Sequence, residues 1–157
     1  MTGRLLLAAA FATAIGFIAA GSATSAAAPC RPSASAGGGP FETNAAPPPR
    51  RSRIGRGHVL TGRVLQYPGC APVRGALIEF WQESANGRYD RRGHGSAITG
   101  RNGAFTFQGP VPPGEFGRPS HIHIHVSAAG YADFVTTYFL ARGERRGRIT
   151  VVLVSDV

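Results

Sequence analysis

The stretch His121-Ile122-His123-Ile124-His125-Val126-Ser127 alternates histidine with a β-branched aliphatic residue along almost its whole length. Because successive side chains of a β-strand point to opposite faces, this alternation predicts a strand with two unlike faces. The aliphatic residues would lie on the face that belongs in a hydrophobic core. The three histidines would share the other face.

Six further segments on either side of this strand also have strand composition, with Val, Ile, Thr and aromatic residues between turn sequences such as Tyr67-Pro68-Gly69. They are His58–Gln66 and residues 76–82, 96–99, 104–108, 134–140 and 148–154. Asn102-Gly103 is a favoured hairpin turn and predicts that residues 96–99 pair with residues 104–108. About seven short strands without helical periodicity predict an all-β fold, an antiparallel Greek-key or transthyretin-like sandwich.

The composition agrees with short strands and many turns. The chain of 157 residues, long enough for one domain, contains 22 glycines and 12 prolines. Its net charge of +9 arises from 17 arginines and no lysine, against 8 acidic residues. The two densest arginine clusters, residues 50–56 and 142–148, lack the interleaved aromatic residues of a base-stacking surface. We therefore expect solvated arginines and no nucleic-acid partner.

The N-terminus has the layout of a secretory signal peptide over residues 1–28. A small-to-apolar run over residues 5–20 follows a basic start, and Ala26-Ala27-Ala28 supplies a cleavage site. Residues 29–56 would then be a flexible arm rich in Pro, Gly and Arg, and residues 57–157 the sandwich domain. We expect a secreted or periplasmic protein with no stable membrane insertion after cleavage. An uncleaved membrane anchor is the alternative.

Cys30 and Cys70 are the two cysteines of the chain, and both follow the expected cleavage site. An oxidising compartment permits a disulfide between them, whereas their separation of 40 residues (70 − 30) is not a metal-site spacing. The bond would attach the arm to the domain and contribute about 3–4 kcal/mol by closing a loop. Two separately used thiols are the alternative.

The three histidines of the strand are candidate metal ligands. Neighbouring side chains on one face of a strand are about 6.6 Å apart, so two of the imidazoles of His121, His123 and His125 can reach one metal ion. Histidines alone favour zinc or copper. A polar strand face without a metal is the alternative.

Several motifs together resemble those of the intradiol ring-cleavage dioxygenases, the family of the catechol and protocatechuate 3,4-dioxygenases. They are Gly75-Ala76-Leu77-Ile78-Glu79-Phe80-Trp81, Gly87-Arg88-Tyr89 and Arg118-Pro119-Ser120-His121-Ile122-His123. The resemblance implies a non-haem Fe(III) ion bound by Tyr89, His121 and His123. It places Arg118 beside the substrate ring, where its charge stabilises the reaction. It also implies an enzyme that uses O2 to open a catecholic ring to a muconate-type diacid; a homo-oligomer is possible.

The chain departs from the family pattern at one ligand. Where the pattern has a second tyrosine, in Pro-Gly-x-Tyr, the chain has Pro113-Gly114-Glu115-Phe116, and a phenyl ring has no oxygen to bind iron. Solvent can take the place of this ligand, in which case activity is retained and Phe116 lines the substrate site. Alternatively, Glu115 or His125 binds the metal in its place. The remaining alternatives are a non-catalytic binding module and a histidine-rich copper or zinc protein.

Overall fold

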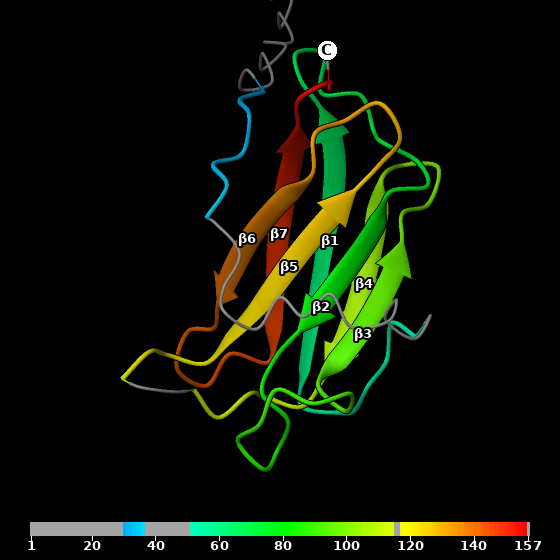
Figure 1. Cartoon of the computed structure of the whole chain (residues 1–157). Coiled ribbons are helices and arrows are strands. Elements are labelled where there is room, and N and C mark those ends of the chain that lie inside the picture. The colour runs from blue at the N-terminus through cyan, green and yellow to red at the C-terminus, as the bar shows by residue number, and fades with distance from the viewer. Residues whose placement is uncertain (1–29, 37–50, 115–116, 157) are drawn as a thin grey trace, which may run out of the picture.

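The computed structural model describes residues 30–36, 51–114 and 117–156, which form a β-sandwich of two sheets (Figure 1). Its strands are β1 (His58–Gln66), β2 (Leu77–Trp81), β3 (His94–Ile98), β4 (Ala104–Gly109), β5 (His121–Ser127), β6 (Phe134–Phe139) and β7 (Arg146–Leu153). One sheet has the order β4-β1-β7 and the other β3-β2-β5-β6. The predicted all-β sandwich of seven strands is confirmed. The expected signal peptide and Phe116 lie outside the described residues.

The strand pairing differs from the expectation in two places. β1 and β7 run parallel, whereas the other four pairs are antiparallel. The predicted hairpin is wrong, because β3 pairs with β2 and β4 pairs with β1 in the opposite sheet. The Asn102-Gly103 turn therefore carries the chain between sheets. Gly103 has a φ of 71°, and a Cβ there would lie 2.4 Å from the Val64 carbonyl oxygen, so the turn requires glycine.

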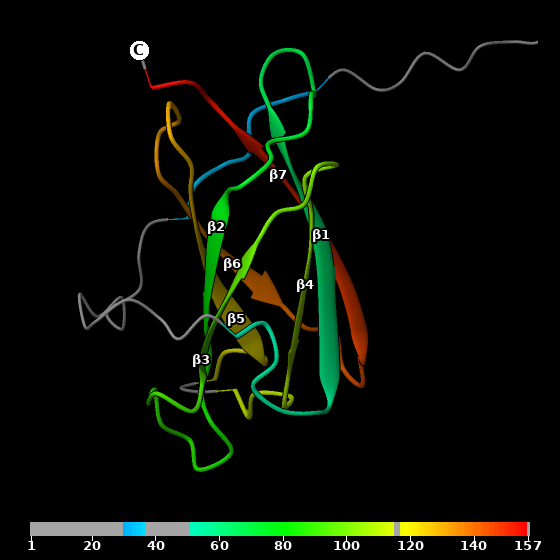
Figure 2. The ribbon, with the colours of Figure 1, turned by 90° about the vertical axis from the view of Figure 1, so that its right-hand side faces the viewer.

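The inner faces of the two sheets form the core, and Figure 2 shows these two layers from the side. Ile122, Ile124 and Val126 of β5 are completely buried there. Phe80 of β2 stacks on Phe107 of β4 with ring centroids 4.3 Å apart, which joins the layers. Burial of the aliphatic face of β5 turns its histidines to the outer face of the four-stranded sheet. The described residues contain no helix that is long and apolar enough to cross a membrane.

The described parts of the expected arm are hydrogen-bonded along the two open sides of the sandwich. On one side, residues 30–36 pass from β7 to β6; on the other, residues 51–54 connect β3 with β4. The backbone bonds run from Ser33 N to Val152 O (3.1 Å), Ala36 N to Val135 O (2.9 Å), Ser96 N to Arg51 O (3.0 Å) and Ile54 N to Gln108 O (2.8 Å). These four strands are the edges of the sheets, so both segments satisfy backbone groups that an edge leaves unpaired.

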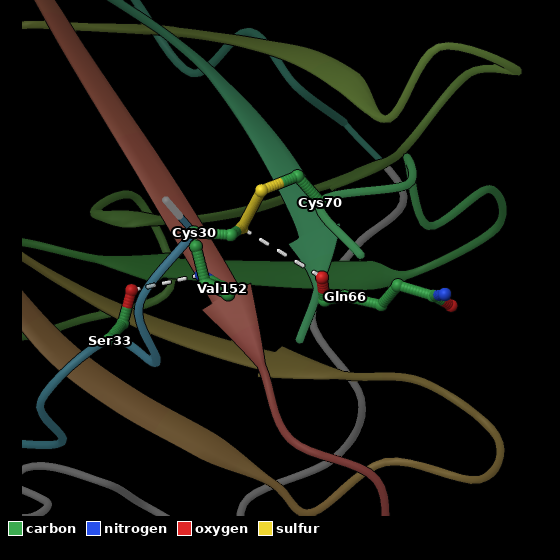
Figure 3. Close-up of a disulfide and its surroundings, with 5 residues drawn as sticks. All are labelled: Cys30, Ser33, Gln66, Cys70 and Val152. Atoms are coloured by element: carbon green, nitrogen blue, oxygen red, sulfur yellow. Dashed lines mark hydrogen bonds between the residues drawn. A yellow bond between two sulfur atoms is a disulfide. The ribbon is translucent and has the colours of Figure 1, made fainter. Parts of the chain in front are cut away.

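A disulfide bond between Cys30 and Cys70 attaches residues 30–36 to the loop that follows β1 (Figure 3). The two Cα atoms are 5.5 Å apart, a usual separation for a disulfide. Ser33 then bonds β7 a second time, because its Oγ accepts a 2.9 Å hydrogen bond from Val152 N. One covalent bond and a series of hydrogen bonds thus hold this segment on the sandwich.

Replacing both cysteines by serine is expected to lower the free energy of unfolding by about 3–4 kcal/mol, because the unfolded chain then has no closed loop. Urea unfolding followed by circular dichroism measures the change. Ser33→Ala is the control, and it should cost about 1 kcal/mol because it removes one hydrogen bond. Unchanged stability of the double variant, or alkylation of both wild-type thiols without reductant, contradicts the prediction.

Candidate metal centre

Polar and aromatic side chains gather on the outer face of the four-stranded sheet, at the end where β5 begins. His121 and His123 lie there and are only 2% and 6% exposed. In the strand register, Phe139 of β6 is opposite His121, Thr137 of β6 is opposite His123, and Trp81 of β2 flanks His123 on the other side. The two histidines are therefore enclosed by the neighbouring strands of their own sheet.

Tyr89 reaches the same place from the loop between β2 and β3. Ser84 shapes this loop, because its backbone nitrogen and its Oγ both donate to the Arg88 carbonyl oxygen, at 2.9 and 3.0 Å. The turn brings the next residue, Tyr89, over β5, with its Oη 3.1 Å from His121 Nε2. The structure thus unites two segments that are 32 residues apart in the chain.

The carboxylate next to Tyr89 has a structural task in the loop. Asp90 Oδ2 accepts hydrogen bonds from Arg92 Nη2 at 2.8 Å and from Arg92 Nε at 3.1 Å. The hydrogen bonds and charge of the Arg92 guanidinium lower the pKa of Asp90 to about 2. Asp90 is therefore ionised and paired at neutral pH, and it stabilises the loop that carries Tyr89.

The hydrogen bonds of His121 determine which ring nitrogen is available to a metal. His121 Nδ1 lies 2.8 Å from the Pro119 carbonyl oxygen, which can only accept. Nδ1 must therefore carry the proton, and Nε2 carries the lone pair. Without a metal this lone pair accepts a hydrogen bond from the Tyr89 hydroxyl, and it is also the group that would bind a metal ion.

His123 completes the arrangement. Its ring is almost perpendicular to that of His121, at 86°, with centroids 4.9 Å apart, and its centroid is 5.8 Å from that of Tyr89. Thr137 Oγ1 lies 3.2 Å from His123 Nδ1. When Nδ1 donates to this hydroxyl, the lone pair of His123 is on Nε2, as in His121.

Thr137→Val is expected to weaken metal affinity by about 10- to 100-fold, because His123 loses the group that orients its ring. Competition with a chelator of known affinity measures the change. Thr136→Val is the matched control: it makes the same substitution on the same strand, opposite Ile124 on the core-facing side. Equal metal affinities of the two variants would show that Thr137 does not orient His123.

His125 is not brought into this group, although it shares the strand face. Its Nδ1 lies 2.9 Å from Glu79 Oε2, and its Nε2 lies 3.3 Å from Asp133 Oδ2. Both ring nitrogens are thus engaged by carboxylates. Of the three histidines in the repeat, the structure places His121 and His123 beside Tyr89 and gives His125 other partners.

Arg118 and Phe139 form the exposed border of the centre. The ring centroids of Phe139 and His121 are 5.6 Å apart, and the Arg118 guanidinium carbon is 5.5 Å from the centroid of the Phe139 ring. Phe139 is 48% exposed, which is unusual for a large apolar side chain. Arg118 was expected at the site, whereas sequence reasoning missed Phe139 and Thr137, whose positions follow from the register of β6 on β5.

The donor groups of the centre suit a hard metal ion such as Fe(III). Metal bonds of about 2.0–2.2 Å place two neighbouring ligand atoms about 3 Å apart, as Tyr89 Oη and His121 Nε2 are. The described residues contain no group of three or more His, Cys, Asp or Glu side chains that could bind a metal. The phenol oxygen of Tyr89 would therefore be the third ligand beside the histidine pair.

The chain is similar in sequence to a hydroxyquinol 1,2-dioxygenase of Rhizobium sp., with 34% identity over 134 residues, covering 64% of this chain and 45% of that protein. Its fold resembles the dioxygenase domain of a dioxygenase carbohydrate-binding protein fusion from Streptomyces sp. SirexAA-E, at 25% identity and a TM-score of 0.69, covering 80% of this chain and 100% of that chain. It also resembles an intradiol ring-cleavage dioxygenase from Tetranychus urticae, at 18% identity and a TM-score of 0.70, covering 80% and 95%.

No protein-family model matches the chain. The chain spans less than half the length of the curated relatives that it matches. These relatives are nevertheless dioxygenases of the kind that the motifs with Tyr89, Arg118 and the histidine pair resemble. By sequence and by fold, the chain is similar to the intradiol ring-cleavage dioxygenases.

Proposed function

We propose that the chain is a non-haem Fe(III) dioxygenase that cleaves a catecholic ring between its two hydroxyl-bearing carbons. The observation that carries the proposal is the 3.1 Å contact between Tyr89 Oη and His121 Nε2, with His123 beside both. Likeness to a hydroxyquinol 1,2-dioxygenase supports this substrate class. Both atoms of O2 enter the product, a muconate-type diacid, so no other oxidant is consumed.

Tyr89, His121 and His123 would hold the iron. A bound Fe(III) ion would supply a Lewis acid that binds the catechol oxygens and makes the ring reactive toward O2. The phenolate of Tyr89 is a hard anionic donor, which favours Fe(III) over Fe(II). For this, the Tyr89 hydroxyl would release its proton to water instead of donating it in the hydrogen bond to His121, and the Pro119 carbonyl would keep the lone pair of His121 on Nε2.

Arg118 and Phe139 would form the substrate side of the centre. The half-exposed ring of Phe139 offers an apolar surface on which an aromatic substrate can pack, close to His121. The Arg118 guanidinium lies over this ring, so its positive charge favours a deprotonated catechol and the negative charge that develops during cleavage. Three protein ligands suffice for the proposal, because a catechol brings two oxygen donors of its own.

Metal analysis and the visible spectrum of protein purified without metal-affinity resin test the proposal. We expect about one iron per chain and the reddish colour of tyrosinate-to-Fe(III) charge transfer. O2 uptake with catechol and with 1,2,4-trihydroxybenzene should then yield a diacid that contains both oxygen atoms of ¹⁸O2. Colourless protein with zinc or copper would indicate a histidine-rich metal protein, and protein that binds no metal would indicate a binding module.

We propose further that the protein acts after export, in a secreted or periplasmic form. The Cys30–Cys70 disulfide supports this, because such bonds persist in oxidising compartments. The mass of the protein recovered from the culture medium or periplasm should be that of the chain without residues 1–28. Recovery of the uncleaved chain from the membrane fraction alone would support an anchor instead.

A further inference from the structure

The outer face of the three-stranded sheet, on the side of the sandwich away from the metal centre, is lined by arginine and threonine. Residues that alternate with the buried core positions point to this face. Register places Arg148, Thr61 and Thr106 in one row across β7, β1 and β4. The next row is Thr150, Arg63 and Ala104, and the two rows line a hollow of about 510 Å³. We name this surface the Arg–Thr face.

The positive charge of the Arg–Thr face has no acidic counterpart on the three strands that form it. β1, β4 and β7 contain no Asp or Glu. Arg63, Arg146 and Arg148 are exposed, and none of them forms an ion pair within the described part of the chain. Arg146 and Arg148 are about 6.6 Å apart along β7. Arg63 is a diagonal neighbour of Arg148 at about 7–8 Å, so an anionic ligand can contact several guanidinium groups at once.

The side chains of this face select among anionic ligands. A guanidinium group binds a carboxylate through two parallel hydrogen bonds, and threonine hydroxyls both donate and accept, as sugar hydroxyls require. Phe105 borders the hollow but is only 5% exposed, so the described residues of this face offer no open aromatic ring on which nucleic-acid bases could stack. None of the large exposed apolar side chains of the described residues lies on these strands, so there is no anchor for a lipid surface.

The shape of the face favours an extended ligand. A small-molecule site usually surrounds most of its ligand, whereas this hollow lies open across three strands. Rows of arginine and threonine allow repeated contacts along a chain, and such contacts add up even when each is weak. We propose that the Arg–Thr face binds an anionic polysaccharide through its carboxylate groups and hydroxyls. This proposal is independent of the metal centre.

Fluorescence anisotropy of a labelled oligogalacturonate, titrated with the full oxidised chain at low ionic strength, tests the proposal. Arg63→Gln with Arg148→Gln should weaken binding by about tenfold or more. The control, Arg74→Gln with Arg101→Gln, loses the same net charge from exposed loop positions and should bind like the wild type. Equal binding by both double variants, or no binding of oligogalacturonate by the wild type, would overturn the proposal.

A third variant separates a polysaccharide site from a general polyanion surface. Thr106→Val with Thr150→Val keeps the β-branched shape and the charge but removes two exposed hydroxyls. It should bind oligogalacturonate several-fold more weakly. Unchanged affinity, or tighter wild-type binding to duplex DNA of equal charge, would overturn the assignment to a polysaccharide. Binding to neutral dextran that equals binding to oligogalacturonate would overturn the role of the carboxylates.

Discussion

Replacing His121 and His123 together by alanine is expected to abolish metal binding and to leave a folded sandwich. The two rings would supply two of the three proposed donor groups, and Tyr89 alone would not retain a metal ion. Both side chains project from the outer face of β5, so the fully buried Ile122 and Ile124 continue to pack in the core. Metal content and the far-ultraviolet circular dichroism spectrum measure the two parts of this prediction.

His125→Ala is the matched control for the double variant. It removes an imidazole from the same face of the same strand, but one whose two nitrogens contact Glu79 and Asp133. This variant should keep its metal, although loss of the contacts with the two carboxylates can lower its stability. Wild-type metal content in the His121→Ala, His123→Ala protein would show that the centre is wrongly placed. Loss of metal from His125→Ala would show that it lies further along β5.

The position and orientation of β5 were predictable from sequence because its pattern is unambiguous. Alternation of histidine and aliphatic residues has the period of a strand, and it also states which side is buried. The observed bounds of β5, His121–Ser127, are those expected from the pattern. The burial of Ile122 and Ile124 then follows from the chemistry of these residues alone.

The pairing of β3 and β4 was not predictable in the same way. Asn102-Gly103 specifies a tight turn, but a turn does not determine whether the two strands bond to each other or to different sheets. Here the Gly103 backbone packs against Val64 of β1, and β4 joins β1. The long-range partners of the strands, rather than the local turn, therefore decide the topology.

The different roles of the three histidines also depend on long-range register. The alternating pattern of β5 does not distinguish His121, His123 and His125 from one another. Thr137 lies opposite His123 only in the observed register of β6, and a shift by one residue would turn its hydroxyl to the other face. Glu79 likewise meets His125 because β2 pairs with β5 in one particular register. The sequence therefore predicted the candidate ligands. It did not predict that Thr137 contacts His123 or that Glu79 contacts His125.

Tyr89→Phe and Tyr138→Phe each remove one phenol oxygen, and only the first is expected to disrupt the metal centre. Tyr89 Oη lies 3.1 Å from His121 Nε2, so its loss would remove the proposed anionic donor. Tyr138 is on β6 opposite Ile122, and its hydroxyl donates to Glu144 Oε1 at 2.5 Å. Burial and the bond to Glu144 raise the pKa of Tyr138 to about 12, so this residue remains a neutral phenol at neutral pH.

Tyr89→Phe should therefore eliminate the charge-transfer band, lower the iron content by at least about tenfold and abolish ring cleavage, with little change in melting temperature. Tyr138→Phe should keep the band and the iron but lose about 1 kcal/mol of stability with its hydrogen bond. Visible spectra, metal analysis and thermal unfolding of the two proteins distinguish these results. A band that persists in Tyr89→Phe and disappears in Tyr138→Phe would transfer the ligand role to Tyr138. Loss of the band in both variants would mean that it reports the stability of the sandwich rather than the identity of the ligand.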